Sequence, residues 1–399
     1  MKDDAMDEQA VFQLLRAALF EEDENVDIED WRCVFEEMKA QSVAALPGMW
    51  LKKHPIEGAD AWQAFCLYRQ GHWLKVMNGQ DQLLKLLEEH GIPCVVIKGM
   101  AAAVEYPYPS LRTMGDVDIL VKRADFEKAA AVTEANGYQV QYEKNPKGHH
   151  YCYRKDGIDF ELHKRPGVIR ETEEDLLSLI EQGIDEREFR ECNGYRFPVL
   201  PAELNGLVLM AHINQHLRGG LGLRQIIDWM MYLDELPEDI REEELMPLLR
   251  DTGMEKLALT VTAMCRKYLG SGTIVDNTED YPCDELMDYI MTKGNFGGKA
   301  GSDGKISSVF FDMADPARVF RRLQNGGLGQ WKAARKYRFL RPFAWMYQSF
   351  YILGYFMRHR VGPGALVRQR EKGLEERELI GKLGLKIDRD IEFKKEELT

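Results

Sequence analysis

Two short segments with acidic residues at alternate positions constrain the fold of this chain more than any other feature. In 115-GDVDILV-121, Asp116 and Asp118 flank one valine at the start of an apolar run. The second segment, 158-IDFELH-163, alternates apolar and polar residues. Because alternate residues of a strand share one face of a sheet, both segments predict strands with carboxylates on one face and a core on the other.

Further strands and helices are expected around these two segments. The apolar run 94-CVVIKG-99 predicts a strand, and residues 100–106 are rich in helix formers. A helix over 124–136 and strands near 138–143 and 150–154 follow from the hydrophobic pattern and the turn residues between them.

Helical patterns precede and follow this strand-rich part, so we expect a chain with four parts. The parts are an N-terminal helical region at 1–79, an α/β core at 80–200, a helical domain over the cleft at 201–295, and a basic, aromatic, helical C-terminal region with a charged tail at 296–399. The glycine-rich segment 294–305 is expected to be a flexible loop.

The net charge of −13 is unevenly distributed along the chain. Residues 316–370 contain 12 Lys or Arg and no Asp or Glu, so the remainder is strongly acidic. Repulsion makes that acidic part a poor nonspecific binder of nucleic acid. If a polyanion binds, we expect the basic segment to help hold it.

Cysteine usage and the apolar stretches predict a reduced, cytoplasmic protein. The seven cysteines are widely spaced without a CxxC pair, which argues for buried thiols and against a zinc site. The first ten residues are acidic and do not resemble a signal peptide. The longest apolar stretch, 343–357, is shorter than the about 20 residues of a membrane span, so we expect no stable membrane insertion.

The paired aspartates predict a metal site. Asp116 and Asp118 should lie roughly 6–7 Å apart on one face of their strand. Two carboxylates that close repel each other, and a divalent cation such as Mg²⁺ removes the conflict. If the strand at 158–163 lies alongside, Glu161 could complete a site for two Mg²⁺ ions, or for Mn²⁺ in their place.

A phosphate site is expected beside this metal site. Lys98-Gly99 lies at a strand-to-helix turn, where glycine lets the backbone approach a phosphate and the helix N-terminus favours an anion. Arg112, shortly before the aspartates, is placed for the same task.

Each of these patterns alone has a more ordinary explanation, and their combination carries the prediction. A lone D-x-D is usually solvated charge at a strand end, a Lys-Gly pair is not a signal, and 158-IDFELH-163 could be an amphipathic edge strand. Here they follow one another in a defined order, with 16 residues between Lys98-Gly99 and Asp116, and 42 residues between Asp118 and Glu161.

That order resembles a known family. The runs 97-IKGMAAAVEYPYPSLRTMGDVDILV-121 and 160-FELHK-164 are similar to the nucleotidyltransferase superfamily of the DNA polymerase beta type, and more closely to the bacterial uncharacterised nucleotidyltransferase family. The similarity covers about residues 80–235. The superfamily at large has Gly-Ser in its first turn, whereas this chain has Lys98-Gly99, so the cradle for the triphosphate departs from the general pattern.

The resemblance implies both a fold and an activity. The fold would be α+β, with a small mixed β-sheet nucleotidyltransferase core flanked by N-terminal and C-terminal helical regions. Asp116 and Asp118 would bind both metals, with Glu161 as the third acidic ligand. The activity would be transfer of a nucleoside monophosphate from an NTP to a hydroxyl acceptor with release of pyrophosphate.

The expected nucleotide-binding residues extend beyond the metal ligands. They are Lys98, Gly99, Arg112, Gly115, His212 and Arg224. No separate general base is required, although His163 could assist. The acceptor could be a small molecule, tRNA or a protein, the last two as in toxin-type nucleotidyltransferases. A nucleotide-binding or partner-binding module with little turnover is the alternative, and the pattern does not predict the oligomeric state.

Several polar residues of the flanking segments have two interpretations. His212 and His216 lie four residues apart on a predicted helix, but the glutamate of a zinc-protease H-E-x-x-H motif is missing, so they either line a nucleotide or acceptor pocket or pack in the helix. Arg224 and Asp228 either form an i,i+4 ion pair or face the cleft. His149-His150 begin a predicted strand that could pass near the site, and of the two interpretations a surface position is favoured.

The basic, aromatic segment 332–360 has three interpretations. It could be a helix pair packed on the domain with arginines at its rim, a contact surface for an RNA or polyphosphate acceptor, or a helix at a membrane surface. Of these, the packed helix pair is favoured.

Overall fold

The computed structural model describes most of the chain, in two compact units. The described residues are 8–22, 26–142, 144–145, 148–167, 169, 173–217, 219–276, 278–297, 299, 316–358 and 363–385. The contacts divide the chain into Met1–Lys299 and Ala300–Thr399. Residues 298 and 300–305 of the expected flexible loop lie outside the described residues.

The N-terminal part of the first unit is helical. Its helices are α1 (Glu8–Leu19), α2 (Trp31–Ala40), α3 (Gly48–Lys53) and α4 (Asp60–Glu89). The 30 residues of α4 form one continuous helix, so the boundary expected between residues 79 and 80 falls inside it.

A seven-stranded mixed sheet forms the centre of this unit. Its strands are β1 (Cys94–Val96), β2 (Val117–Val121), β3 (Gln139–Val140), β4 (His150–Lys155), β5 (Ile158–His163), β6 (Glu188–Cys192) and β7 (Tyr195–Val199). They lie in the order β3-β4-β5-β2-β1-β7-β6, with β2–β5 and β1–β7 parallel and the other pairs antiparallel. The predicted α+β fold with a small mixed sheet is therefore confirmed.

Left-handed residues at two tight turns shape the sheet. Asp156 and Gly157, with φ of 52° and 72°, turn β4 back into β5. Asn193 and Gly194, with φ of 49° and 81°, connect β6 to β7. Positive φ at both central residues suits a two-residue hairpin, and Asn-Gly is its strongest sequence signal. The β6–β7 hairpin is absent from the strands expected above, although Asn193-Gly194 could have indicated it.

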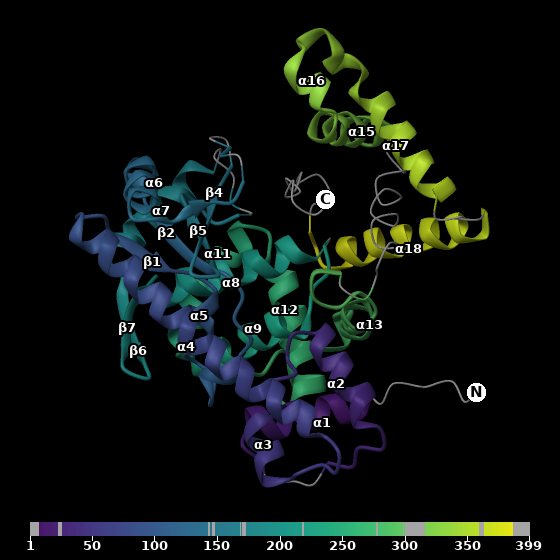
Figure 1. Ribbon diagram of the computed structural model, residues 1–399. Helices are drawn as coiled ribbons and strands as arrows, with labels where there is room; N and C mark the ends of the chain where they lie inside the picture. The colour runs from purple at the N-terminus through teal and green to yellow at the C-terminus, as the bar shows by residue number, and fades with distance from the viewer. Residues whose placement is uncertain are drawn as a thin grey trace. The chain divides into compact units, whose positions relative to one another are not determined.

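One face of the sheet is covered by α4 and by α6 (Phe126–Ala135), as Figure 1 shows. The core between them contains Trp73, Met77, Phe126, Ile119 and Phe160. Tyr151 and Tyr153 of β4 and Leu162 of β5 belong to the same core. By strand alternation, the residues between them point to the opposite face.

More helices complete the first unit. They are α5 (Gly99–Ala103), α7 (Glu174–Asp185), α8 (Ala202–His216), α9 (Leu223–Glu235), α10 (Glu238–Ile240), α11 (Met246–Asp251), α12 (Glu255–Met264) and α13 (Cys283–Lys293). Helix α9 is buried from Leu223 to Leu233, including its polar residues. It is therefore a central helix rather than a surface one.

The described residues of the second unit are mainly helical. They are α15 (Pro316–Gln330), α16 (Lys332–Lys336), α17 (Ala344–Arg358) and α18 (Pro363–Lys382), with a 3-10 helix at Arg338–Phe343. Helices α15 and α17 pack as a pair (Figure 1), and Gly327 of α15 lies against the backbone of Ala344 at the start of α17. Among the described residues, no helix has the length and apolarity needed to cross a bilayer.

Replacing Gly79 by valine tests the packing of α4 on the sheet. A Cβ at Gly79 would lie 2.7 Å from Ile158 Cδ1 and 3.1 Å from Phe160 Cζ. We expect Gly79→Val to lower the free energy of unfolding by about 1–3 kcal/mol, because overpacking displaces side chains from their positions. Urea unfolding followed by circular dichroism measures the change. Gly71→Val is the control, since Gly71 is exposed on the same helix with open space around it; an equal loss in both variants would contradict this packing.

Candidate active site

The strand register brings two of the three predicted acidic ligands together. Asp118 of β2 and Glu161 of β5 are direct partners in the parallel pairing, so their side chains share one face. This is the face opposite α4 and α6. Both residues are buried, with 4% and 6% of their surface exposed. Asp116 lies just before β2 and is half-buried.

Lys98 is the point where the acidic residues converge. Its Nζ donates a hydrogen bond to Asp118 Oδ1 at 2.7 Å. Burial of the ammonium disfavours its charge, but the carboxylates of Asp118, Glu161 and Asp116 more than offset this and raise the pKa of Lys98 above its ordinary value. All three predicted metal ligands therefore act on one ammonium group.

His163 connects the two buried carboxylates. Its Nε2 lies 2.8 Å from Asp118 Oδ1 and 3.2 Å from Glu161 Oε2, and the side chain is fully buried. Burial raises the pKa of Asp118, but the charge of Lys98 and the hydrogen bond of His163 outweigh it, so this pKa is lowered. Asp118 is thus ionised, and Nε2 of His163 carries the proton of that hydrogen bond. His163 therefore contacts both buried carboxylates directly.

The Lys98-Gly99 turn holds an unusual backbone conformation. Lys98 has φ 55° and ψ −132°, a combination that costs a non-glycine residue about 1–3 kcal/mol and is found mainly at functional sites. A Cβ at Gly99 would lie 3.8 Å from the backbone oxygen of Asp116, so this turn packs on the segment leading into β2. Helix α5 after the turn has only five residues, so its N-terminus offers little dipole for a phosphate.

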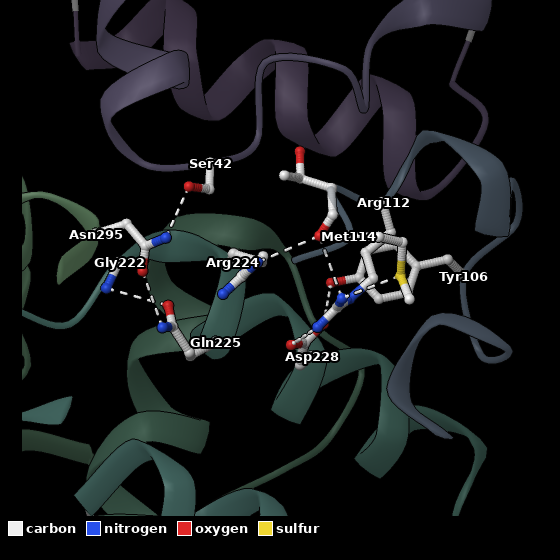
Figure 2. A network of polar contacts seen from close by, with 10 residues as sticks. Ser42, Tyr106, Arg112, Met114, Gly222, Arg224, Gln225, Asp228 and Asn295 are labelled. Atoms are coloured by element: carbon white, nitrogen blue, oxygen red, sulfur yellow. Dashed lines mark hydrogen bonds and ion pairs between the residues drawn. The ribbon is translucent and has the colours of Figure 1, made fainter. Parts of the chain in front are cut away.

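Arg112 forms a buried ion pair with Asp228. Figure 2 shows its guanidinium against Asp228 of α9, with Nε to Oδ1 at 2.9 Å and Nη2 to Oδ2 at 2.6 Å. Tyr106 donates its hydroxyl to the same carboxylate at 2.7 Å. Arg112 also donates to the backbone oxygen of Thr113 at 3.2 Å. Arg112 thus links Asp228 to residues 113–115, which lead to Asp116, and its expected contact with a phosphate stays a prediction.

Arg224 lies beside the same segment. Its Nη1 donates to the backbone oxygen of Thr113 at 3.3 Å and is 4.0 Å from the position of a Cβ on Gly115. Burial and the charge of Arg112 lower the pKa of Arg224, while the charges of Asp228 and Asp116 act in the opposite direction. Helix α9 thus places Arg224 next to Gly115 and Asp116, on the side predicted to face the cleft.

The predicted histidines divide into two groups. His212 and His216 of α8 pack edge to face with ring centroids 4.4 Å apart, and a place for them in a nucleotide pocket stays a prediction. The surface position expected for His149-His150 is wrong. Both are partly buried, and their rings lie 5.8 Å and 5.1 Å from the ring of His163. Burial and the neighbouring histidines lower the pKa of His149 well below its usual range.

Strand pairing explains why sequence reasoning missed part of the site. The β4–β5 register places His150 opposite His163 and Cys152 opposite Glu161. The sequence Lys155-Asp156-Gly157 is a tight-turn signal, and counting outward from this turn gives the register of the two strands. The Lys98–Asp118 ion pair has no such signal, because it depends on the antiparallel packing of β1 against β2.

The arrangement fits a divalent cation. Carboxylate oxygens of Asp118 and Glu161 lie within 4.8 Å of each other and of a ring nitrogen of His163, all in buried side chains. Buried like charges are costly unless they are neutralised, and here an ammonium and an imidazole contact them. Carboxylate oxygens are the ligands that Mg²⁺ prefers in proteins.

Replacing Asp228 tests the ion pair behind the site. We expect Asp228→Asn to lower the free energy of unfolding by about 3–5 kcal/mol, because the buried charge of Arg112 loses its counter-ion. Thermal or urea unfolding measures the loss. In the control, Asp185→Asn removes an exposed partner of Lys122 and should cost less than about 1 kcal/mol. Equal effects of the two substitutions would contradict the structural role given to Asp228.

Comparison with known proteins connects this geometry to a family. A search of the curated proteins found no significant relative. The sequence profile of a family described as uncharacterised nucleotidyltransferase matches residues 27–270, more than half of the chain. The matched range contains every strand of the sheet and the helices α8 and α9. The chain therefore belongs to this family of nucleotidyltransferases.

Proposed function

We propose that this protein is a metal-dependent nucleotidyltransferase that moves a nucleoside monophosphate from an NTP to a hydroxyl acceptor and releases pyrophosphate. The observation that carries the proposal is the convergence of Asp118, Glu161 and Asp116 on Lys98, on the face of the sheet opposite the core. Membership of a nucleotidyltransferase family supports the same class of reaction.

The three carboxylates are the metal ligands in this proposal. Held by Asp116, Asp118 and Glu161, two Mg²⁺ ions would supply Lewis-acid stabilisation of the triphosphate and of the attacking oxygen. His163 holds the buried carboxylates in place through Nε2. Its hydrogen bonds fix the direction of the oxygens, as partners of metal ligands commonly do.

The nucleotide would bind along the segment that leads into β2. Gly99 and Gly115 leave room for a close backbone approach, and Arg224 and Lys98 supply positive charge next to Asp116. Arg112 acts as a positioning residue through its pair with Asp228. His212 remains a proposed contact from α8.

The acceptor hydroxyl could belong to a small molecule, a tRNA or a protein. The alternative function is a nucleotide-binding or partner-binding module with little turnover. Retention of a costly buried carboxylate pair, Asp118 and Glu161, favours turnover, because binding alone does not need two buried negative charges at one point.

A transfer assay with matched variants tests the function. The full chain is incubated with each NTP labelled at the α-phosphate, Mg²⁺ or Mn²⁺, and separate pools of small molecules, tRNA and proteins. We expect label transfer that a chelator abolishes and added Mg²⁺ restores. Asp118→Asn and Glu161→Gln should lower the rate by roughly 10³-fold, because they remove charge that holds the metal.

Asp159→Asn is the control for that assay. Asp159 shares the face of Glu161 on β5, but its side chain is half exposed and paired with Arg154. It should keep the rate within about twofold, as expected for an exposed pair. Tight NTP binding without transfer to any pool would support the binding module. Equal losses in all three variants would contradict the assigned ligands.

A further inference from the structure

We propose that His150, Cys152 and Glu161 form a second metal site, for a divalent ion of the zinc class such as Zn²⁺ or Co²⁺. This site adjoins the acidic site and shares Glu161 with it. Its binding of metal stands on the geometry alone, whereas its effect on catalysis rests on the proposed function.

The site is built by two adjacent antiparallel strands. Along β4, His150 and Cys152 alternate with the core residues Tyr151 and Tyr153, so both point away from the core. Cys152 is the direct cross-strand partner of Glu161. An H-x-C pair on one strand therefore faces a glutamate on the next.

The two oxygens of Glu161 face different neighbours. Oε1 lies 3.5 Å from His150 Nε2 and 4.0 Å from Cys152 Sγ. Oε2 lies 3.2 Å from His163 Nε2, on the side of Asp118. The carboxylate can thus bridge a nitrogen and sulfur site on one side and the acidic site on the other.

The distances are those of a site close to its bound geometry. Ligand atoms of His150, Cys152 and Glu161 all lie within 4.8 Å of one another. Zinc ligands lie about 2.0–2.3 Å from the ion, so ligand atoms in a tetrahedral site are separated by roughly 3.3–3.8 Å. Small side-chain movements would bring these three atoms to that spacing.

The ligand types select the metal. Mg²⁺ takes oxygen ligands, whereas an imidazole, a thiolate and one carboxylate suit a borderline-soft ion. Three protein ligands leave a fourth position of the tetrahedron for water or another group. The spacing of the cysteines argued against a zinc site, and the present proposal departs from that expectation because strand pairing brings a single cysteine beside a histidine and a glutamate.

Sharing Glu161 couples the two sites. A cation bound by His150 and Cys152 would partly neutralise the carboxylate of Glu161. The acidic site would then bind Mg²⁺ with lower affinity. Micromolar Zn²⁺ should therefore raise the Mg²⁺ concentration needed for nucleotidyl transfer.

Cobalt titration tests the site independently of activity. The full chain is freed of metal, kept reduced and titrated with Co²⁺ while the visible and near-ultraviolet spectra are recorded. We expect one equivalent to bind, with intense visible bands of tetrahedral Co²⁺ and a near-ultraviolet sulfur-to-cobalt charge-transfer band. Zn²⁺ should displace the cobalt and erase both signals.

Four variants decide the assignment. Cys152→Ser should lose the charge-transfer band, and His150→Gln should bind Co²⁺ at least about tenfold more weakly. Cys33→Ser and His90→Gln, which lie on α2 and just after α4, are the controls and should retain the wild-type spectrum. Far-ultraviolet circular dichroism without metal checks that each variant is folded. If Cys152→Ser is not folded, Cys152→Ala takes its place.

Two results would overturn the proposal. One is a wild-type cobalt complex without a charge-transfer band. The other is unchanged Co²⁺ affinity in both Cys152→Ser and His150→Gln. If the chain binds Co²⁺ as expected but transfers no label, the metal site stands and the proposed function fails. If the chain transfers label but does not bind Co²⁺, the proposed function stands and the second metal site fails.

Discussion

Parallel pairing of β2 with β5 brings the two buried carboxylates of the site together. This pairing sets Asp118 against Glu161, and the antiparallel β4–β5 pairing then sets Cys152 and His150 beside them. A slip of one residue would turn these side chains into the core and bring core residues such as Ile119 to the polar face. The register is strongly specified because α4 and α6 bury the opposite face of the same strands.

The cost of this arrangement is a group of buried negative charges, and two neighbours reduce it. Lys98 contacts Asp118 from the turn after β1, and His163 contacts both Asp118 and Glu161 from β5. Lys98 itself has a positive φ of 55°, which a residue with a side chain rarely adopts. Buried charges and a strained backbone at the same point both lower stability locally. Such a combination is typical of functional sites.

A second buried ion pair, Arg112 with Asp228, lies near the acidic site and fixes the segment that leads into it. Arg112 and Asp228 pair deep in the protein, with Tyr106 on the same carboxylate, and tie residues 113–115 to α9. Helix α9 also contributes Arg224 beside Gly115. The helical part after residue 200 therefore helps to hold the segment that precedes β2. Through this segment it positions Asp116 of the candidate site. Local sequence patterns predicted neither the partner of Arg112 nor this link, because the partners are 116 residues apart.

The sequence by itself determined the strands β2 and β5, the turn between β4 and β5, and the three acidic residues of the candidate site, because alternation and turn chemistry are local properties. Family resemblance supplied the class of reaction, and the profile match at residues 27–270 agrees with it. The tertiary structure decided which groups meet. It assigned Arg112 to a buried ion pair, joined Lys98 to Asp118, and placed His150 and Cys152 beside Glu161 on the polar face. These contacts depend on long-range pairing and burial, where the energy of a charge depends on its partner and not on its neighbours along the chain.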